Sequence, residues 1–138
     1  MYDVDVVVPG EPASAKNQRR IVQVHGKPRI IKSKKALDYA RAFAHNFPKL
    51  DPLIEDDVAL RLDVWYASRR PDLGAMDLVM DLLQGLAYVN DRQVKASVST
   101  WNLDRENPRT RVRLIRAPHE SSVGLSSFKL SRIWPEET

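Results

Sequence analysis

Four aspartates lie in the largely apolar stretch "RRPDLGAMDLVMDLLQGLAYVNDRQV", residues 69–94 of the sequence. They are Asp72, Asp77, Asp81 and Asp91. No lysine or arginine occurs between residues 71 and 90, so no base close in sequence compensates their charge. Carboxylates in apolar surroundings are costly unless they are paired or bound to a cation. Carboxylates that converge without histidine or cysteine favour Mg²⁺, or Mn²⁺, over zinc.

An ion pair with an arginine elsewhere is the alternative explanation for any one of these aspartates. The candidate partners are Arg69, Arg70 and Arg92. For the whole set, the apolar setting and the basic segments on either side favour a metal site. We therefore expect Asp72, Asp77, Asp81 and Asp91 to be metal ligands.

Residues 75–84 predict a helix that ends at Gly85, a residue typical of helix C-termini. On this helix Asp77, Asp81 and Gln84 fall at positions i, i+4 and i+7, which form one narrow polar strip. The remaining positions are mostly apolar, which predicts that the helix is largely buried. Two carboxylates should therefore share one side of it.

The elements that must position this helix follow from the alternation and breakers of the rest of the chain. Ser33 is a candidate N-cap for a helix that Pro48 stops. The predicted elements are a strand at 2–8, two short strands within 21–31 joined by a turn at His25-Gly26 or Gly26-Lys27, a helix at 34–47, strands at 58–68, 93–101 and 109–117, and a connector or short strand at 87–94. This order predicts an α+β domain in two layers, a mixed β-sheet packed with two main helices.

A chain of 138 residues suits one domain, which we place at residues 1–116. Residues 117–138 predict a tail that is loosely held, or docked at a dimer through Phe128, Ile133 and Trp134. The sequence has no cysteine, which excludes disulfides, thiol catalysis and cysteine-bound zinc. Its first residues lack a secretory signal, and no apolar run reaches transmembrane length, so we expect a cytoplasmic protein with no membrane partner.

The net charge of +4 is unevenly distributed. Residues 14–42 hold nine Lys/Arg and one acid, residues 43–91 hold nine acids and four bases, and residues 92–116 hold seven bases and two acids. Two basic segments on either side of an acidic middle are typical of a protein that binds a polyanion. The alternative is that these charged runs are only solvated surface.

Several of these stretches together resemble the RusA-type Holliday-junction resolvases, endonucleases common in bacteria and their prophages. They are "RRPDL" at 69–73, the helix with Asp81, "LLQGLAYVNDRQV" at 82–94 with Lys95, and the basic stretches "SAKNQRR" and "GKPRIIKSKKALDYAR". The resemblance covers about residues 2–116. It implies a RusA-like fold and Mg²⁺-dependent, paired hydrolysis of four-way DNA junctions by a homodimer of bacterial or phage origin, in recombination and repair.

The resemblance also assigns roles to particular residues. The first acid of the family's Asp-Leu-Asp motif matches Asp72, the acid of "NDRQV" matches Asp91, and the helix acid matches Asp81. The second acid of Asp-Leu-Asp is Gly74 here, and we expect Asp77 to supply that carboxylate. The expected catalytic residues are thus Asp72, Asp77, Asp91 and Lys95, where Lys95 faces the scissile phosphate.

Basic residues near these acids and in the first basic segment are the expected contacts to the DNA backbone. They are Lys16, Arg19, Arg20, Lys27, Arg29, Lys32, Lys34, Lys35, Arg69, Arg70 and Arg92. Two other functions stay open at this point. One is a non-catalytic or weakened DNA-binding protein of the same fold. The other is a structural or regulatory protein whose acidic strip binds a basic partner.

Overall fold

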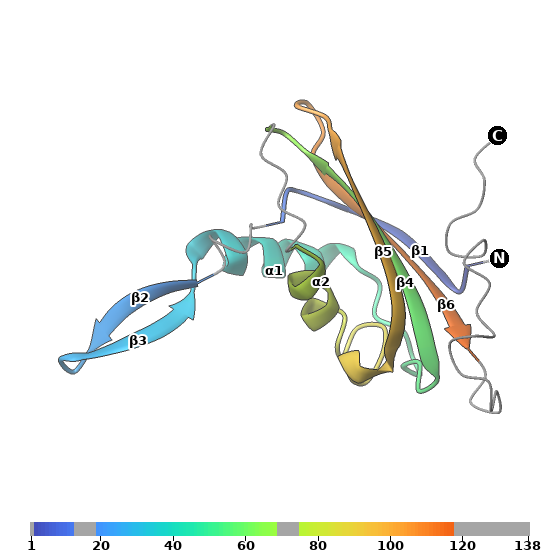
Figure 1. Cartoon of the computed structure of the whole chain (residues 1–138), viewed down its shortest axis with the longest axis horizontal. Coiled ribbons are helices and arrows are strands. Elements are labelled where there is room, and N and C mark those ends of the chain that lie inside the picture. Colours follow the sequence, from blue (N-terminus) through green and yellow to red (C-terminus); the bar gives the residue numbers. More distant parts are fainter. Residues whose placement is uncertain (1, 13–18, 69–74, 118–138) are drawn as a thin grey trace.

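A mixed β-sheet of four strands forms the centre of the protein in this computed structural model, which describes residues 2–12, 19–68 and 75–117. The strand order is β1 (Val4–Pro9), β6 (Arg109–Ala117), β4 (Asp57–Tyr66) and β5 (Val94–Leu103) (Figure 1). β6 is antiparallel to both β1 and β4, whereas β5 is parallel to β4. A parallel neighbour requires a crossover connection, and the segment that contains α2 (Ala75–Leu82) provides it.

Helices α1 (Lys34–Asn46) and α2 contribute to the main hydrophobic core with the sheet. α1 begins where the sequence predicts, because the Ser33 hydroxyl accepts a hydrogen bond from the Ala36 N–H at 3.2 Å. Tyr39 and Phe43 of α1 and Val79 of α2 are buried in this core with alternate residues of β4. The predicted α+β fold, a mixed sheet packed with two helices, is confirmed.

Strands β2 (Arg19–Val24) and β3 (Lys27–Lys32) pair with each other as a separate hairpin. Its turn is His25-Gly26, the first of the two predicted positions, and both residues have positive φ, 53° and 77°. Two-residue loops of this kind match the twist of the strands that they join. Figure 1 shows the hairpin projecting from the start of α1, away from the sheet.

The second face of the sheet carries a buried ion cluster centred on Asp63 of β4. Asp63 accepts hydrogen bonds from Thr100 Oγ1 at 2.6 Å, from Arg61 Nε at 3.2 Å and from the Arg113 guanidinium. Burial alone would raise the pKa of Asp63, but the hydrogen bonds from Thr100 and Arg113 and the charges of both arginines outweigh it and lower the pKa. Alternation places Arg61 and Asp63 on the face of β4 away from the core, where Thr100 and Arg113 from other strands complete the cluster.

Some predictions concern residues that the structure does not describe. The proposed tail is almost entirely among them, because the described residues end at Ala117. The division into a domain at 1–116 and a tail therefore stays a prediction. Among the described residues, no helix is long and apolar enough to cross a membrane.

Candidate active site

The segment "NDRQ" forms a tight 3-10 turn, η2 (Asp91–Gln93), where the sequence predicted a connector or short strand. Asn90 caps it, and its side chain accepts a hydrogen bond from the Arg92 N–H at 2.9 Å. The Gln93 side chain in return accepts from the Asn90 N–H at 2.9 Å. This reciprocal capping holds Asp91 at the first position of the turn.

Gln93 also fixes the turn to the rest of the protein. Its Oε1 accepts from the Val89 N–H at 3.0 Å, and its Nε2 donates to the carbonyls of Ile54 at 2.8 Å and Asp56 at 2.9 Å. The two carbonyls belong to the loop that leads into β4. One side chain therefore links the turn that bears Asp91 to the sheet.

Gln84 connects the turn to the end of α2. Its Nε2 donates to Asp81 Oδ1 at 3.0 Å, and its Oε1 accepts from the Asp91 N–H at 2.9 Å. A single amide group therefore spans from the helix carboxylate to the backbone of the turn. In this way the structure brings together Asp81 and Asp91, which lie ten residues apart in the sequence.

Tyr88 lies beside both carboxylates and donates from its hydroxyl to the Met80 carbonyl at 2.6 Å. Burial raises the pKa of this phenol, and the negative charges of Asp91 and Asp81 raise it further. The hydroxyl therefore stays protonated and can only donate toward Met80.

Asp77, on α2, and Lys95, two residues after η2, are both exposed. Asp77 lies one helical turn before Asp81 on α2, as the predicted strip requires. Lys95 occupies a bulge in β5, because Val94 pairs with Val58 and the next pair is Ala96 with Ala59. A bulge changes the direction of a side chain and often occurs next to an active site.

The remaining predicted ligand, Asp72, lies outside the described residues, as do Lys16, Arg69 and Arg70. Within residues 2–12, 19–68 and 75–117, no three histidine, cysteine, aspartate or glutamate side chains gather closely enough to hold a metal ion. Asp77, Asp81 and Asp91 therefore do not form a three-ligand site by themselves.

The predicted DNA contacts that are described lie mainly on the hairpin and at the start of α1. Lys27, Lys34, Lys35 and Arg92 are exposed, and Lys35 Nζ lies 3.9 Å from Glu11 Oε1. For four others the structure describes the backbone only, in strands β2 and β3: Arg19, Arg20, Arg29 and Lys32.

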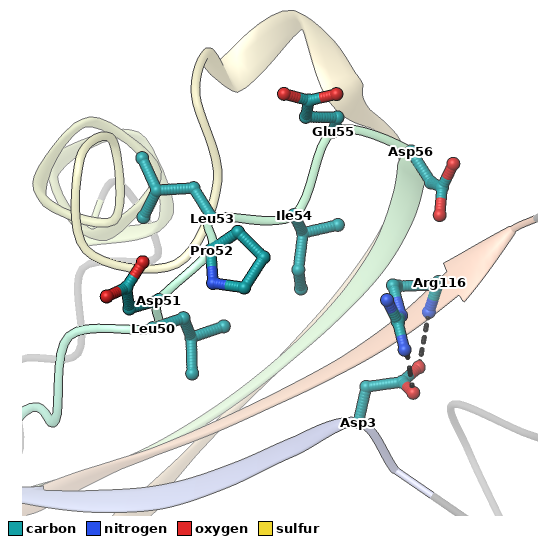
Figure 2. Close-up of a pocket in the computed structure, with 9 residues that line it drawn as sticks. All are labelled: Asp3, Leu50, Asp51, Pro52, Leu53, Ile54, Glu55, Asp56 and Arg116. Carbon is teal, nitrogen blue, oxygen red and sulfur yellow. Dashed lines mark hydrogen bonds and ion pairs between the residues drawn. The ribbon is translucent and has the colours of Figure 1, made fainter.

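A pocket of about 540 Å³ lies beside the loop at residues 50–56 (Figure 2). Four carboxylates line it, from Asp3, Asp51, Glu55 and Asp56, together with Arg116. The Arg116 side chain and N–H both bind Asp3, at 3.5 Å and 2.7 Å. A concavity this acidic repels phosphates, so we place no DNA there.

Sequence reasoning did not assign the residues that position the carboxylates. Gln84 was read only as part of the polar strip, and Gln93 and Tyr88 were given no role. The spacing of Asn90 and Gln93 is a signal that could have identified the turn, since Asn-x-x-Gln is a variant of the capping box. The bridge through Gln84 had no such signal, because it depends on how residues 85–90 fold.

Comparison with known proteins supplies the class and the family. A family model described as endodeoxyribonuclease RusA matches residues 9–115, which include the hairpin, both helices and η2. The match defines an endodeoxyribonuclease, an enzyme that cuts within a DNA chain. The chain belongs to the RusA family of Holliday-junction-resolving endonucleases. Comparison with curated proteins finds no significant match.

Proposed function

We propose that the protein resolves four-way DNA junctions by Mg²⁺-dependent, paired phosphodiester hydrolysis in recombination and repair. The observation that carries this proposal is the bridge through Gln84, which holds Asp81 and Asp91 at one place. Asp81 lies in the last turn of α2 and Asp91 begins η2, which leads into the edge strand β5. Because the family cleaves DNA, we expect a metal ion to be the cation that compensates the charges of these two carboxylates.

The donor set at this place fits Mg²⁺. Mg²⁺ usually keeps several water molecules and is bound through one or two carboxylates together with substrate phosphates. Asp81 and Asp91 provide two carboxylates from described residues, and Asp77 and Asp72 would complete the set. When bound, the metal would polarise a phosphodiester and lower the pKa of an attacking water molecule. Mn²⁺ has the same preference for oxygen ligands and could replace it.

The protein's own residues would divide the remaining work. Asp72, Asp77 and Asp91 would hold the reacting groups in line, and the exposed Lys95 would stabilise the negative charge that develops on the phosphate. The capped turn would keep Asp91 in a fixed position, which is what a preorganised site requires.

The exposed bases Lys27, Lys34, Lys35 and Arg92 would bind neighbouring phosphates without reading the base sequence. The other bases predicted to do so would extend this contact: Lys16, Arg19, Arg20, Arg29, Lys32, Arg69 and Arg70. A four-way junction is two-fold symmetric, so paired cuts require a symmetric homodimer. The tail at 117–138 remains a candidate for the dimer contact.

A non-catalytic junction-binding protein of the same fold is the second candidate. One observation favours it: no three-ligand group is present among the described residues. Gly74, which stands where the family motif has a carboxylate, also favours a non-catalytic protein.

A synthetic mobile four-way junction and a linear duplex of the same sequence, each with and without Mg²⁺, separate these functions. We expect symmetric nicks in the junction only, and only with Mg²⁺. Asp91→Asn and Asp72→Asn should abolish cleavage but retain or tighten junction binding, because a carboxylate beside a polyanion repels it when no metal is present. Asp38→Asn, an exposed change on α1, is the control and should cut normally.

Each other outcome selects a different function. Binding without nicks at any Mg²⁺ concentration would support the non-catalytic protein. Neither binding nor nicks would support a protein whose acidic strip binds a basic partner. Wild-type cutting by Asp91→Asn would show that the site is assigned to the wrong residues.

A further inference from the structure

The β2–β3 hairpin makes its extensive contacts within itself. Among the described residues, no backbone hydrogen bond joins it to another strand or helix. Figure 1 shows it extending outward from the start of α1. A single two-stranded hairpin is at best marginally stable in water. A hairpin that the described part of the chain does not cover is therefore expected to gain stability from a partner.

The charge of the hairpin selects the kind of partner. Residues 19–32 contain five bases and no acid: Arg19, Arg20, Lys27, Arg29 and Lys32. The bases lie on both strands, and Arg19 and Lys32 are paired in register at the open end of the hairpin. Two copies of such a hairpin repel each other, whereas the phosphates on both sides of a DNA groove attract it.

The shape of the hairpin fits the same partner. Each strand has six residues, so the hairpin is about 20 Å long at the usual rise of a strand. The tip of the hairpin is accessible to a partner, since its residues are exposed: Gln23, His25, Lys27 and Pro28. The major groove of B-DNA, about 12 Å wide, admits a two-stranded β-ribbon.

We propose that the β2–β3 hairpin is an arm that enters the major groove of a duplex arm of the DNA substrate, with the His25-Gly26 turn at its leading end. The proposal rests on the proposed function to the extent that the partner is junction DNA. In this position the basic side chains near the turn reach the groove, while the basic side chains at the open end of the hairpin remain near the phosphates. Because the hairpin binds a duplex arm, it contacts the substrate at a distance from the point of cleavage.

The absence of cysteine allows a direct test on the full-length protein. A cleavage reagent, an iron chelate that generates hydroxyl radicals, is attached at Gln23→Cys near the tip or, as a control, at Glu106→Cys in the exposed loop between β5 and β6. Radicals from position 23 should cut within a duplex arm. Those from position 106 should give a different pattern or none. Methyl green, which fills the major groove, should suppress the cuts from position 23, and the minor-groove ligand distamycin should not.

Charge variants give an independent measurement. Lys27→Gln with Arg29→Gln should weaken junction binding and reduce the salt slope of the binding constant by about two, because two phosphate contacts are lost. Lys49→Gln with Arg105→Gln removes the same charge at exposed positions outside the hairpin and should leave the slope nearly unchanged. Equal slopes in the two pairs would overturn the proposal.

Other outcomes are equally decisive. Suppression by distamycin alone, or no cuts from position 23 by a protein that still cleaves junctions, overturns the arm and leaves the proposed function standing. Cuts from position 23 by a protein that never cleaves junctions support the arm and remove the proposed function. A fluorophore attached at Gln23→Cys gives a further check. If rising protein concentration without DNA shields it from a dissolved quencher, the hairpin contacts a second copy of the protein, and the proposal is overturned.

Discussion

Gln84 is the residue that joins the Asp81 carboxylate to the backbone of Asp91, because its one amide group contacts both. The amide nitrogen is a donor and cannot bind a metal, and the amide oxygen already accepts from the Asp91 N–H. Gln84 therefore acts by positioning, in the way that residues around metal ligands usually do.

Gln84→Ala should raise the Mg²⁺ concentration needed for half-maximal cleavage by about tenfold, the usual effect of losing a residue that orients a ligand. The two lost hydrogen bonds should also lower the free energy of unfolding by about 1 kcal/mol each. Titration of cleavage against Mg²⁺, with urea unfolding alongside, measures both. An unchanged Mg²⁺ requirement in a destabilised variant would mean that Gln84 only supports the fold.

Asp77 is the residue at which this chain departs from the family motif. If it replaces the carboxylate absent at Gly74, Asp77→Asn should reduce cleavage as severely as Asp72→Asn. It should also raise stability without metal by a few tenths of a kcal/mol, because a repelling i, i+4 pair is removed. If the site is instead incomplete, Gly74→Asp should increase cleavage. Rates for both variants on one junction decide between these cases, and full activity in Asp77→Asn would rule out the replacement.

At the scale of elements, η2 depends on Gln93, which makes two hydrogen bonds inside the turn and two to the loop before β4. Gln93→Ala should lower the free energy of unfolding by about 2 kcal/mol or more, because two partly buried carbonyls lose their donor. Arg92→Ala, an exposed change in the same turn, should leave stability within about 0.5 kcal/mol. Urea unfolding of both proteins tests this prediction. Equal stabilities would show that the hydrogen bonds of Gln93 do not hold η2 to the loop before β4.

The ion cluster between β4 and β6 should make the sheet sensitive to acid. The folded protein lowers the pKa of Asp63, so the stability it contributes is complete above the ordinary carboxyl range and is lost as pH falls through the folded pKa. Asp63→Asn should cost about 3 kcal/mol at pH 7, since two buried arginines lose their charged partner. The difference from wild type should shrink below about pH 4.

Urea unfolding of wild type and Asp63→Asn at several pH values measures that difference. Asp38→Asn, at an exposed position, should follow the wild-type curve. A difference that stays constant from neutral to acid pH would show that Asp63 contributes through its shape and not through its charge. If Asp63→Asn does not fold, the acid unfolding of wild type still tests the direction of the pKa shift.

Local patterns predicted most elements but not how they combine. Ser33, the turn within residues 25–27 and the alternation at 58–68 each act within a few residues, and each prediction holds in the structure. Strand neighbours depend on distant contacts, so the sequence did not reveal that β6 lies between β1 and β4. For the same reason the strip of Asp77 and Asp81 could be predicted, whereas the bridge from Asp81 to Asp91 could not.

At the scale of the whole molecule, acidic and basic side chains lie on different elements. Asp77 and Asp81 lie on α2 and Asp91 begins η2, while the hairpin and the start of α1 carry exposed basic residues. Phosphates would be held by the basic elements and brought toward carboxylates that repel them unless a cation intervenes. This arrangement makes metal binding a condition for close approach as well as for chemistry.

Cleavage of a supercoiled plasmid that extrudes a cruciform tests the central claim most directly, because paired cuts across the junction convert it to linear DNA in one binding event. We predict that the wild-type protein gives linear plasmid with Mg²⁺ and no product with EDTA, and that Asp91→Asn leaves the plasmid supercoiled. Linear product in EDTA, linear product from Asp91→Asn, or open circles without linear DNA from the wild type would contradict metal-dependent, paired cleavage at this site.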